Sequence, residues 1–145
     1  MSGPAPQNFK NHTRLVPPYH FVMFGILLVN LVAAVKTLVA IHDFAHVLQA
    51  AVAVALILGF FYARAFAVTV QDRVIRLEMR QRLAALAPEL MTRFDEFTVR
   101  QLVALRFAGD GELRSLAQQT LEGKFASSKA IKQQIQNWKA DHWRA

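Results

Sequence analysis

The segments FVMFGILLVNLVAAV (residues 21–35) and VLQAAVAVALILGFFYA (residues 47–63) are almost continuously apolar. A helix needs about 20 residues to cross the hydrocarbon of a bilayer. Extending the two segments to 19–39 and 44–66 supplies that length. Neither segment reads as a signal peptide, because no small-residue cleavage site follows the first and the second comes directly after it. The sequence therefore predicts two transmembrane spans.

The distribution of Lys and Arg predicts how the spans are oriented. Lys10 and Arg14 precede the first span, Lys36 lies near the turn, and 14 of the 17 basic residues lie from Arg64 onward. Cytoplasmic flanks of membrane spans are rich in Lys and Arg. We therefore expect a multi-pass protein with both termini in the cytoplasm.

The overall charge and the lack of cysteine limit the partners and the chemistry. The formal net charge is +7, and the chain has no cysteine, so disulfide and thiolate chemistry are excluded. Basic segments next to a membrane are attracted to anionic lipid headgroups. Because no nucleic-acid-binding motif is present, we expect a lipid bilayer with anionic headgroups as the partner of this charge, and no nucleic acid.

The chain divides into three predicted regions of an all-α protein. Residues 1–18 hold four of the five prolines and form an arm without continuous helix, whose later part, 9–20, is expected in the headgroup region. Residues 19–70 form a transmembrane hairpin, because the turn at 40–43 is too short for anything but antiparallel neighbours. Residues 71–145 form a small cytoplasmic helical domain.

Small residues recur at every fourth position of the second span and predict where the helices approach each other. Depth matching around the turn places Gly25 opposite Gly59 and Ala33 opposite Ala51, with Gly25 and Gly59 closest. The alternative is that an alanine-rich span produces such a run by chance. The full ridge is Ala51, Ala55, Gly59, Ala63 and Ala67.

The second span is expected to continue as one long helix, since neither Pro nor Gly interrupts residues 60–87. At about 100° per residue, this extension has two apolar stripes on opposite sides. One stripe is expected to pack on the C-terminal part of the chain, and the other on a second copy or a different protein. The first contains Ile75, Met79, Leu83 and Leu86, and the second, an assembly stripe, contains Val70, Val74, Leu77 and Ala84.

Local signals predict short helices after Pro88, which ends the long helix. Thr98 and Gln101 have the spacing of a capping box, and Gly109 is expected to stop that helix. Asp110 is expected to cap the next helix. Ser127 or Ser128 should cap a last helix that runs to about Arg144.

Basic side chains along the long helix are candidates for contact with lipid or with a partner. Arg64 lies at the end of the second span, from where it can reach the headgroups. Arg73, Arg76 and Arg80 line one edge of the extension. Two alternatives stay open for this row: binding of acidic headgroups, or ion pairs with Asp95, Glu96 or a neighbouring copy.

Polar side chains in and near the spans have two interpretations each. Asn30, Gln49 and Lys36 either satisfy helix packing or line a pore. His42 and His46 have the i,i+4 spacing of a metal or haem pair, but no third ligand is nearby and Asp43 is suited to cap the second span. His12, His20 and His142 are expected at the surface or the membrane interface.

Four blocks resemble a family of small bacterial two-span membrane proteins that is defined as a domain of unknown function. They are QNFKNHTR (7–14) with Pro18, Tyr19 and His20; DRVIRLE (72–78); TVRQLVALRFA (98–108); and KAIKQQIQNWKADH (129–142). The resemblance covers almost the whole chain. It implies a bacterial inner-membrane setting and supplies no activity or functional residues.

The sequence contains no glycine-rich phosphate loop, no paired-carboxylate signature and no Ser or Cys nucleophile motif. We therefore expect no enzymatic activity and no cofactor. The expected function is that of a structural or accessory subunit, either self-associating or part of a larger membrane complex. The alternative is a small oligomeric ion channel or pore.

Overall fold

The computed structural model describes residues 6–12 and 16–141, and these residues form helices without any β-strand. The chain divides into two compact units. The hairpin unit is Leu15–Val68, and the helical unit combines Met1–Arg14 with Thr69–Ala145. Residues 6–12 of the predicted N-terminal arm therefore belong by their contacts to the helical unit.

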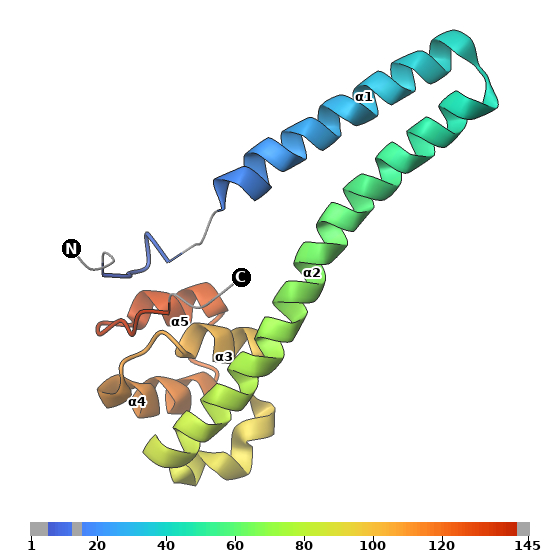
Figure 1. The fold of residues 1–145 in the computed structure, drawn as a ribbon. Coiled ribbons are helices and arrows are strands. Elements are labelled where there is room, and N and C mark those ends of the chain that lie inside the picture. The colour runs from blue at the N-terminus through green and yellow to red at the C-terminus, as the bar shows by residue number, and fades with distance from the viewer. Residues whose placement is uncertain (1–5, 13–15, 142–145) are drawn as a thin grey trace. The chain divides into compact units, whose positions relative to one another are not determined.

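The hairpin unit consists of two antiparallel helices (Figure 1). A π-helical turn, η1 (Pro18–Met23), leads into α1 (Phe24–Ile41), and α2 (Phe44–Leu86) begins two residues later. His42 ends α1 in the left-handed region, with φ at 55° and its N–H donating to the Leu38 carbonyl. The carboxylate of Asp43 accepts from the His46 N–H at 2.9 Å, which confirms Asp43 as the cap of the second helix.

Side chains at alternating spacings of three and four residues face inward in the hairpin. Tyr19 stacks on Phe60 at 4.3 Å between ring centroids, and its hydroxyl donates to the Phe60 carbonyl at 2.6 Å. Contact residues that recur alternately every three and four residues are typical of helices that cross at a small angle. Ala34, Ala53 and Phe60 are buried, and Leu27, Leu31, Leu38, Ala50 and Ile57 are half-buried.

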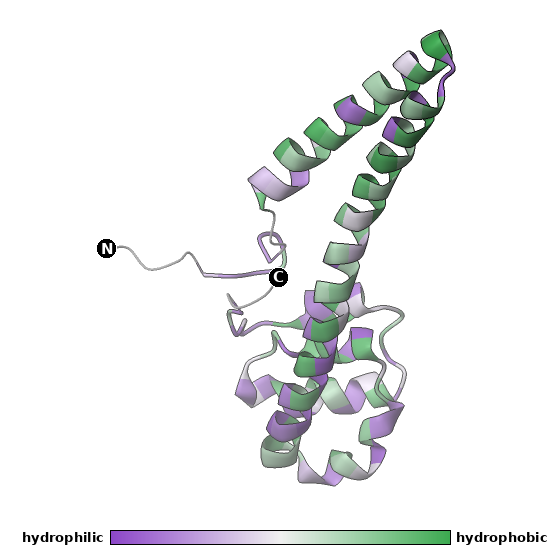
Figure 2. Cartoon of the chain, turned by 45° about the vertical axis from the view of Figure 1, so that its right-hand side comes forward, coloured by the Kyte–Doolittle hydropathy of each residue, from purple (hydrophilic) through white to green (hydrophobic). Residues whose placement is uncertain are grey.

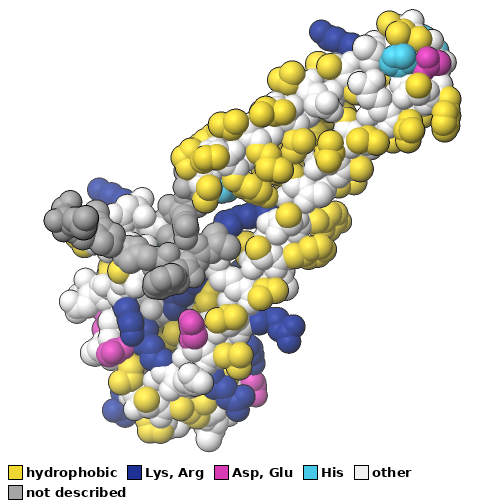
Figure 3. All heavy atoms as spheres, viewed as in Figure 1, with side chains coloured by type: hydrophobic (Ala, Val, Ile, Leu, Met, Phe, Trp, Pro, Cys, Tyr) yellow, Lys and Arg dark blue, Asp and Glu magenta, His cyan; other side chains and the backbone are white. Residues whose placement is uncertain are grey.

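Most other large side chains of the hairpin unit are apolar and exposed. Figure 2 shows the two helices largely green, and Figure 3 shows apolar side chains over much of their surface. By length and composition, Pro18–Ile41 and Phe44–Leu86 are long and apolar enough to cross a membrane. The two predicted apolar helices are thus present, with a surface of the composition that a bilayer would cover.

The helical unit begins with the later part of α2, which continues without interruption to Leu86. Pro88 starts a 3₁₀ segment, η2 (Pro88–Glu96), so the predicted end of the long helix is confirmed. The remaining elements are α3 (Val99–Leu105), α4 (Asp110–Leu121) and α5 (Ser128–Gln134). The capping box is also confirmed, because the Thr98 side chain accepts from the Gln101 N–H and the Gln101 side chain accepts from the Thr98 N–H.

All of these elements contribute to one core. The α2 side chains in this core include three members of the first predicted stripe, Ile75, Met79 and Leu83, and the fourth member, Leu86, packs partly buried against it. This stripe is therefore covered by the C-terminal part of the chain, as expected. The core is completed by Ala87, Leu90, Phe94, Phe97, Leu102, Ala104, Leu105, Phe107, Ala108, Leu113, Leu116, Ala117, Ile131 and Ile135.

Two predicted helix ends differ from the structure. Gly109, expected to stop the first short helix, is instead the N-cap of α4, and Asp110 is the first residue of that helix rather than its cap. Ser127 does cap α5, but this helix ends at Gln134, and Arg144 lies outside the described residues. The chain leaves the helix because Asn137 O accepts from the Gly109 N–H at 2.7 Å, and Phe107 O accepts from the Lys139 N–H at 2.8 Å.

Candidate functional site

The side of α2 opposite the core of the helical unit presents the second predicted stripe. Ile75, Met79 and Leu83 are 3%, 2% and 0% exposed. By contrast, Val70 is 61% exposed, Val74 47% and Leu77 63%. Among the described residues of the helical unit, these three are the large apolar side chains that are exposed. The stripe is therefore open in the isolated chain.

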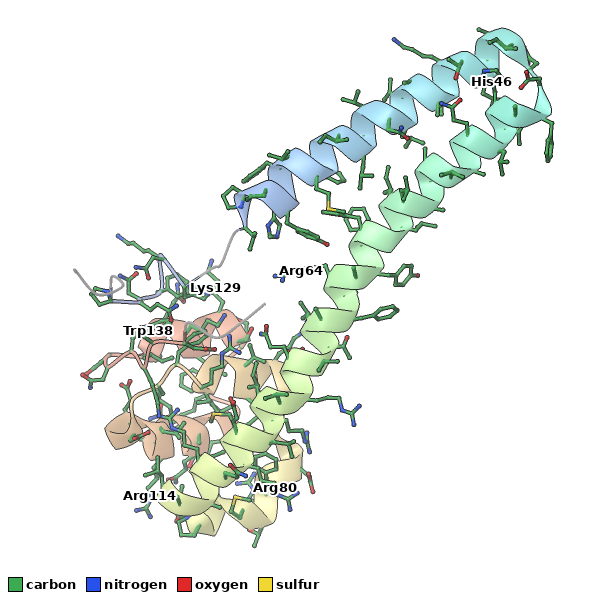
Figure 4. The ribbon with its side chains drawn as sticks, in the orientation of Figure 1. His46, Arg64, Arg80, Arg114, Lys129 and Trp138 are labelled. Carbon is green, nitrogen blue, oxygen red and sulfur yellow. The ribbon has the colours of Figure 1, made fainter. Side chains whose placement is uncertain are left out.

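The arginine row beside the stripe, Arg73, Arg76 and Arg80, contains side chains that contact other described residues of the chain and one that makes no ion pair with them. Arg76 donates to the carboxylate of Asp95 at 2.7 Å and lies over the Phe94 ring at 5.3 Å. Arg80 also lies over this ring, at 5.8 Å, and Figure 4 shows it on α2 in the helical unit. Arg73 is exposed and makes no ion pair with any described residue. The expected pair with Asp95 is thus confirmed for Arg76, whereas Arg73 is available to an external partner.

Arg64 is a half-buried side chain of α2 in the hairpin unit, and Figure 4 marks its position. It makes no ion pair with any part of the chain that the structure describes. Its expected contact with headgroups or a partner therefore remains a proposal.

The predicted ridge of small residues is not where the two hairpin helices meet. Ala51, Ala55, Gly59 and Ala33 are exposed. A Cβ added at Gly25 or at Gly59 would find no atom within 4 Å, so the predicted close approach of these glycines within the chain is wrong. The reason is geometric: a four-residue spacing drifts by about 40° per step around a helix. The observed contact line alternates steps of three and four residues and does not drift in this way.

The polar residues of the hairpin lie on its outer surface. Asn30, Gln49 and Lys36 are all exposed. Asn30 and Lys36 are six residues apart, which places them about 120° apart around α1. A single chain therefore does not gather them, and a pore lined by all three would require several copies that meet on different faces.

The two histidines at the turn differ in their contacts. The ring Nδ1 of His46 lies 2.5 Å from the Asp43 carboxylate, whereas His42 is exposed at the left-handed end of α1. Within residues 6–12 and 16–141, no group of three or more His, Asp or Glu side chains could hold a metal ion. The Asp43–His46 contact is a capping interaction that fixes the start of α2.

The structure reveals a polar cluster that the sequence did not predict, formed where the N-terminal arm docks on the helical unit. The side-chain amide of Gln7 donates to the Asp141 carbonyl at 3.0 Å and accepts from the Asp141 N–H at 2.9 Å. His12 packs against Phe107 and Trp138, each at 5.7 Å between ring centroids. His12 is therefore half-buried against the helical unit rather than at a free surface, whereas the expected position of residues 9–20 in the headgroup region stays a prediction; His142 lies outside the described residues.

A carboxylate and a guanidinium organise the backbone around this cluster. Glu112 accepts from the N–H groups of Gly109, Gln136 and Asn137 at 3.3, 3.0 and 3.0 Å. Arg82 donates to the carbonyls of Arg106 and Ala108 and to the carboxylate of Asp110. The hydrogen bond from Arg82 lowers the pKa of Asp110 below its usual range. Glu in the first turn of α4 was the only sequence signal for the Glu112 contacts.

A pocket of about 300 Å³ lies beside this network. Its cations are matched by acids of the protein: Arg82 by Asp110, Arg106 by Asp141 at 3.4 Å, and Lys139 by Asp110 at 3.8 Å. These contacts hold the helices and the C-terminal segment together. The charged residues of the pocket therefore stabilise the fold, and their arrangement does not indicate a ligand. It is lined by Glu78, Met79, Arg82, Arg106, Lys139, Ala140 and Asp141.

All four sequence blocks described above contribute to the helical unit. Gln7 and His12 come from the first block, Glu78 from the second, Arg106 and Phe107 from the third, and Lys132, Trp138 and Asp141 from the fourth. No curated protein and no solved structure matches the chain. A family model matches residues 1–145. The predicted resemblance to a domain of unknown function is thereby confirmed at this level, and the chain belongs to the family of unknown function DUF6526.

Proposed function

We propose that this protein is a non-enzymatic integral membrane protein that acts as a structural or accessory subunit of a membrane assembly. The hairpin unit is the anchor, in the inner membrane of a bacterium. Its two apolar helices and their exposed apolar side chains support this assignment. Both termini lie in the cytoplasm, as indicated by the 14 of 17 Lys and Arg residues from Arg64 onward.

The exposed stripe of the helical unit is the observation on which the assembly role rests. Val70, Val74 and Leu77 are 61%, 47% and 63% exposed, while the other described large apolar side chains of this unit are at least half-buried. Large apolar side chains grouped on one exposed face are typical of interaction sites. A partner helix along α2 would remove this surface from water.

Basic side chains next to the stripe add contact with anionic headgroups or with the partner. Arg64, Arg73 and Arg80 make no ion pair with described residues, and Arg80 lies over the Phe94 ring. Each free cation near an anionic surface contributes about 1 kcal/mol to membrane attraction. Arg76 differs, because Asp95 already neutralises it.

Gentle extraction in native lipid, followed by measurement of stoichiometry, tests the assembly. We expect the full chain to appear in a complex with a second copy or another protein. Changing both Val74 and Leu77 to Glu should leave the chain in the membrane and dissociate that complex. The control changes Ala126 and Gln133 to Glu, two exposed positions away from the stripe, and should leave the complex intact.

Four outcomes would each contradict the proposal or a part of it. A chain that runs as a monomer, and whose helical unit unfolds on the double change, would show that the stripe serves only folding. A chain recovered in the soluble fraction would exclude the anchor. Reporter fusions at Met1 and Ala145 test the orientation, and an external C-terminus would show that one span had been misassigned. Ion flux through liposomes that contain the purified protein would favour the channel instead.

A further inference from the structure

The exposed stripe of α2 has the spacing of a coiled-coil seam. Val70, Val74, Leu77, Gln81 and Ala84 are separated alternately by four and three residues, and all five are exposed. Two helices that supercoil around each other bury such positions, which recur every 3.5 residues on average. In this pattern, Val74 and Gln81 are a positions, and Val70, Leu77 and Ala84 are d positions.

The charged residues that flank the seam are complementary to each other. Arg73 and Arg80 precede the two a positions on one side, and Glu78 follows the central d position on the other. Arg73 and Glu78 are exposed, and neither forms an ion pair with any residue that the structure describes. Two other charged side chains of α2 already have partners, since Arg76 pairs with Asp95 and Arg82 with Asp110.

We propose that the partner on this stripe is a second copy of the same chain, packed in parallel as a short two-stranded coiled coil. The proposal rests on the proposed function, because anchoring of both copies in one membrane in the same orientation makes their α2 helices parallel. In a parallel pair, the residue before an a position faces the e residue five positions later on the other helix. Arg73 of each copy then lies opposite Glu78 of the other.

The charges disfavour the antiparallel arrangement and argue against other occupants. In an antiparallel pair, the flanks with Arg73 and Arg80 would face each other and bring like charges together. An anionic lipid surface on this face would meet Glu78. A two-fold interface requires a surface that is complementary to itself, and the Arg73–Glu78 arrangement meets that requirement.

The seam residues also indicate the number of helices. A β-branched residue at a with Leu at d favours two strands, and Val74 and Leu77 supply this combination. A polar residue at a second a position fixes register and oligomeric state at some cost in stability, and Gln81 occupies that position.

The test uses charge exchange in the full chain, extracted in native lipid. The chain has no cysteine, so Val74→Cys gives a single crosslinking site at the predicted two-fold axis. In this background, Arg73→Glu and Glu78→Arg should each lower the crosslinked fraction, on the order of tenfold, since two attractive pairs become repulsive. Lys129→Glu, at an exposed position outside the stripe, is the matched control and should have no effect.

Two combinations distinguish contact between copies from loss of folding. The double variant R73E/E78R should recover the crosslink, because the exchanged pairs are again of opposite charge. A mixture of the R73E and E78R chains should give crosslinks mainly between the two kinds of chain. If neither recovery occurs, or if an Ala126→Cys control crosslinks as readily as Val74→Cys, the parallel dimer is wrong.

Failure of this inference is distinguishable from failure of the proposed function. A complex that contains one copy of this chain with a different protein would overturn the dimer and leave the assembly role intact. A monomer in every background would overturn both. Membrane flotation of each variant shows whether a lost crosslink reflects a lost anchor.

Discussion

The two units place the same kinds of residue in opposite environments, although α2 belongs to both. In the hairpin unit, large side chains such as Leu58 and Phe61 are exposed. In the helical unit, Leu83 and Leu102 are fully buried, and among its described residues the exposed large apolar side chains are confined to the stripe at Val70, Val74 and Leu77. Exposed apolar residues are therefore expected in the hairpin unit, where lipid is the expected solvent. In the helical unit they indicate an interaction surface.

Polar contacts differ between the units in the same way. The described residues of the hairpin use few polar contacts, such as the Tyr19 hydroxyl on the Phe60 carbonyl and the Asp43 cap. The helical unit uses many, including ion pairs of Arg82 and Arg106 and the three N–H groups bound by Glu112. Polar groups that the helical unit buries lose water as a partner, so its fold depends on satisfying them internally.

The largest expected difference between the units concerns leucine truncation within α2. Leu83→Ala should lower the free energy of unfolding of the helical unit by about 2–5 kcal/mol, because the fully buried side chain leaves a cavity. Leu58→Ala, on the exposed surface of the hairpin, should change stability by less than about 0.5 kcal/mol. Denaturant titration in mild detergent compares them, with tryptophan fluorescence to follow the helical unit, which holds both tryptophans, and far-ultraviolet circular dichroism to follow the helices of both units. Equal effects would show that Leu58 is covered in the native state.

Substitution of small residues separates the observed hairpin contact from the predicted ridge. Ala53→Leu should destabilise the hairpin by about 1–3 kcal/mol, because Ala53 is buried and a larger side chain must push the helices apart. Gly59→Leu should cost less than about 0.5 kcal/mol in the single chain, because a side chain there meets nothing within 4 Å. Thermal melting of the monomer in detergent, followed by far-ultraviolet circular dichroism, compares them. A larger effect at Gly59 than at Ala53 would show that the predicted ridge of small residues does form the helix contact.

Several features that depend on residues close in the sequence were predicted correctly, although Gly109 and Asp110 proved to be the N-cap and the first residue of α4. Pro88 ends α2, Thr98 and Gln101 form the capping box, and Ser127 caps α5, since each involves a backbone group within a few residues. The two stripes of α2 were also predicted, because the turn of about 100° per residue in a continuous helix fixes which residues share a side. The sequence of α2 alone was therefore sufficient to group its residues into two opposite sides.

Features that depend on distant segments were not predictable. Gln7 binds the Asp141 backbone across 134 residues of sequence, and no local pattern indicates such a pair. The end of α5 at Gln134 follows from partners on α4 and on the segment after α3, which the helical pattern of α5 does not contain. The Gly25–Gly59 pairing failed for a related reason, since depth matching gives the level of a residue but not its direction around the helix.

Removal of the Glu112 carboxylate should destabilise the helical unit specifically. Glu112→Ala leaves the N–H groups of Gly109, Gln136 and Asn137 without their acceptor, at a cost of about 1–3 kcal/mol. Glu112→Gln retains one acceptor oxygen and should recover part of that loss. Amide hydrogen exchange should rise at Gln136 and Asn137 and remain unchanged in the hairpin unit. Unchanged exchange at both amides would show that these hydrogen bonds do not hold the C-terminal segment.

The smallest expected effect is a pH dependence confined to the helical unit. Asp110 is exposed, and hydrogen bonding from Arg82 lowers its pKa below the usual range. Because the folded-state pKa is the lower one, the ionised carboxylate stabilises the fold above the unfolded-state value, about 3.9, and this contribution is lost as pH falls through the folded-state pKa. Asp110→Asn should therefore reduce the difference in stability between neutral and acidic solution. Melting of the helical unit at both pH values tests this expectation, with Asp72→Asn as the control, because no ion pair of Asp72 with a described residue is present. An unchanged pH dependence in Asp110→Asn would show that the Arg82 contact does not contribute to stability.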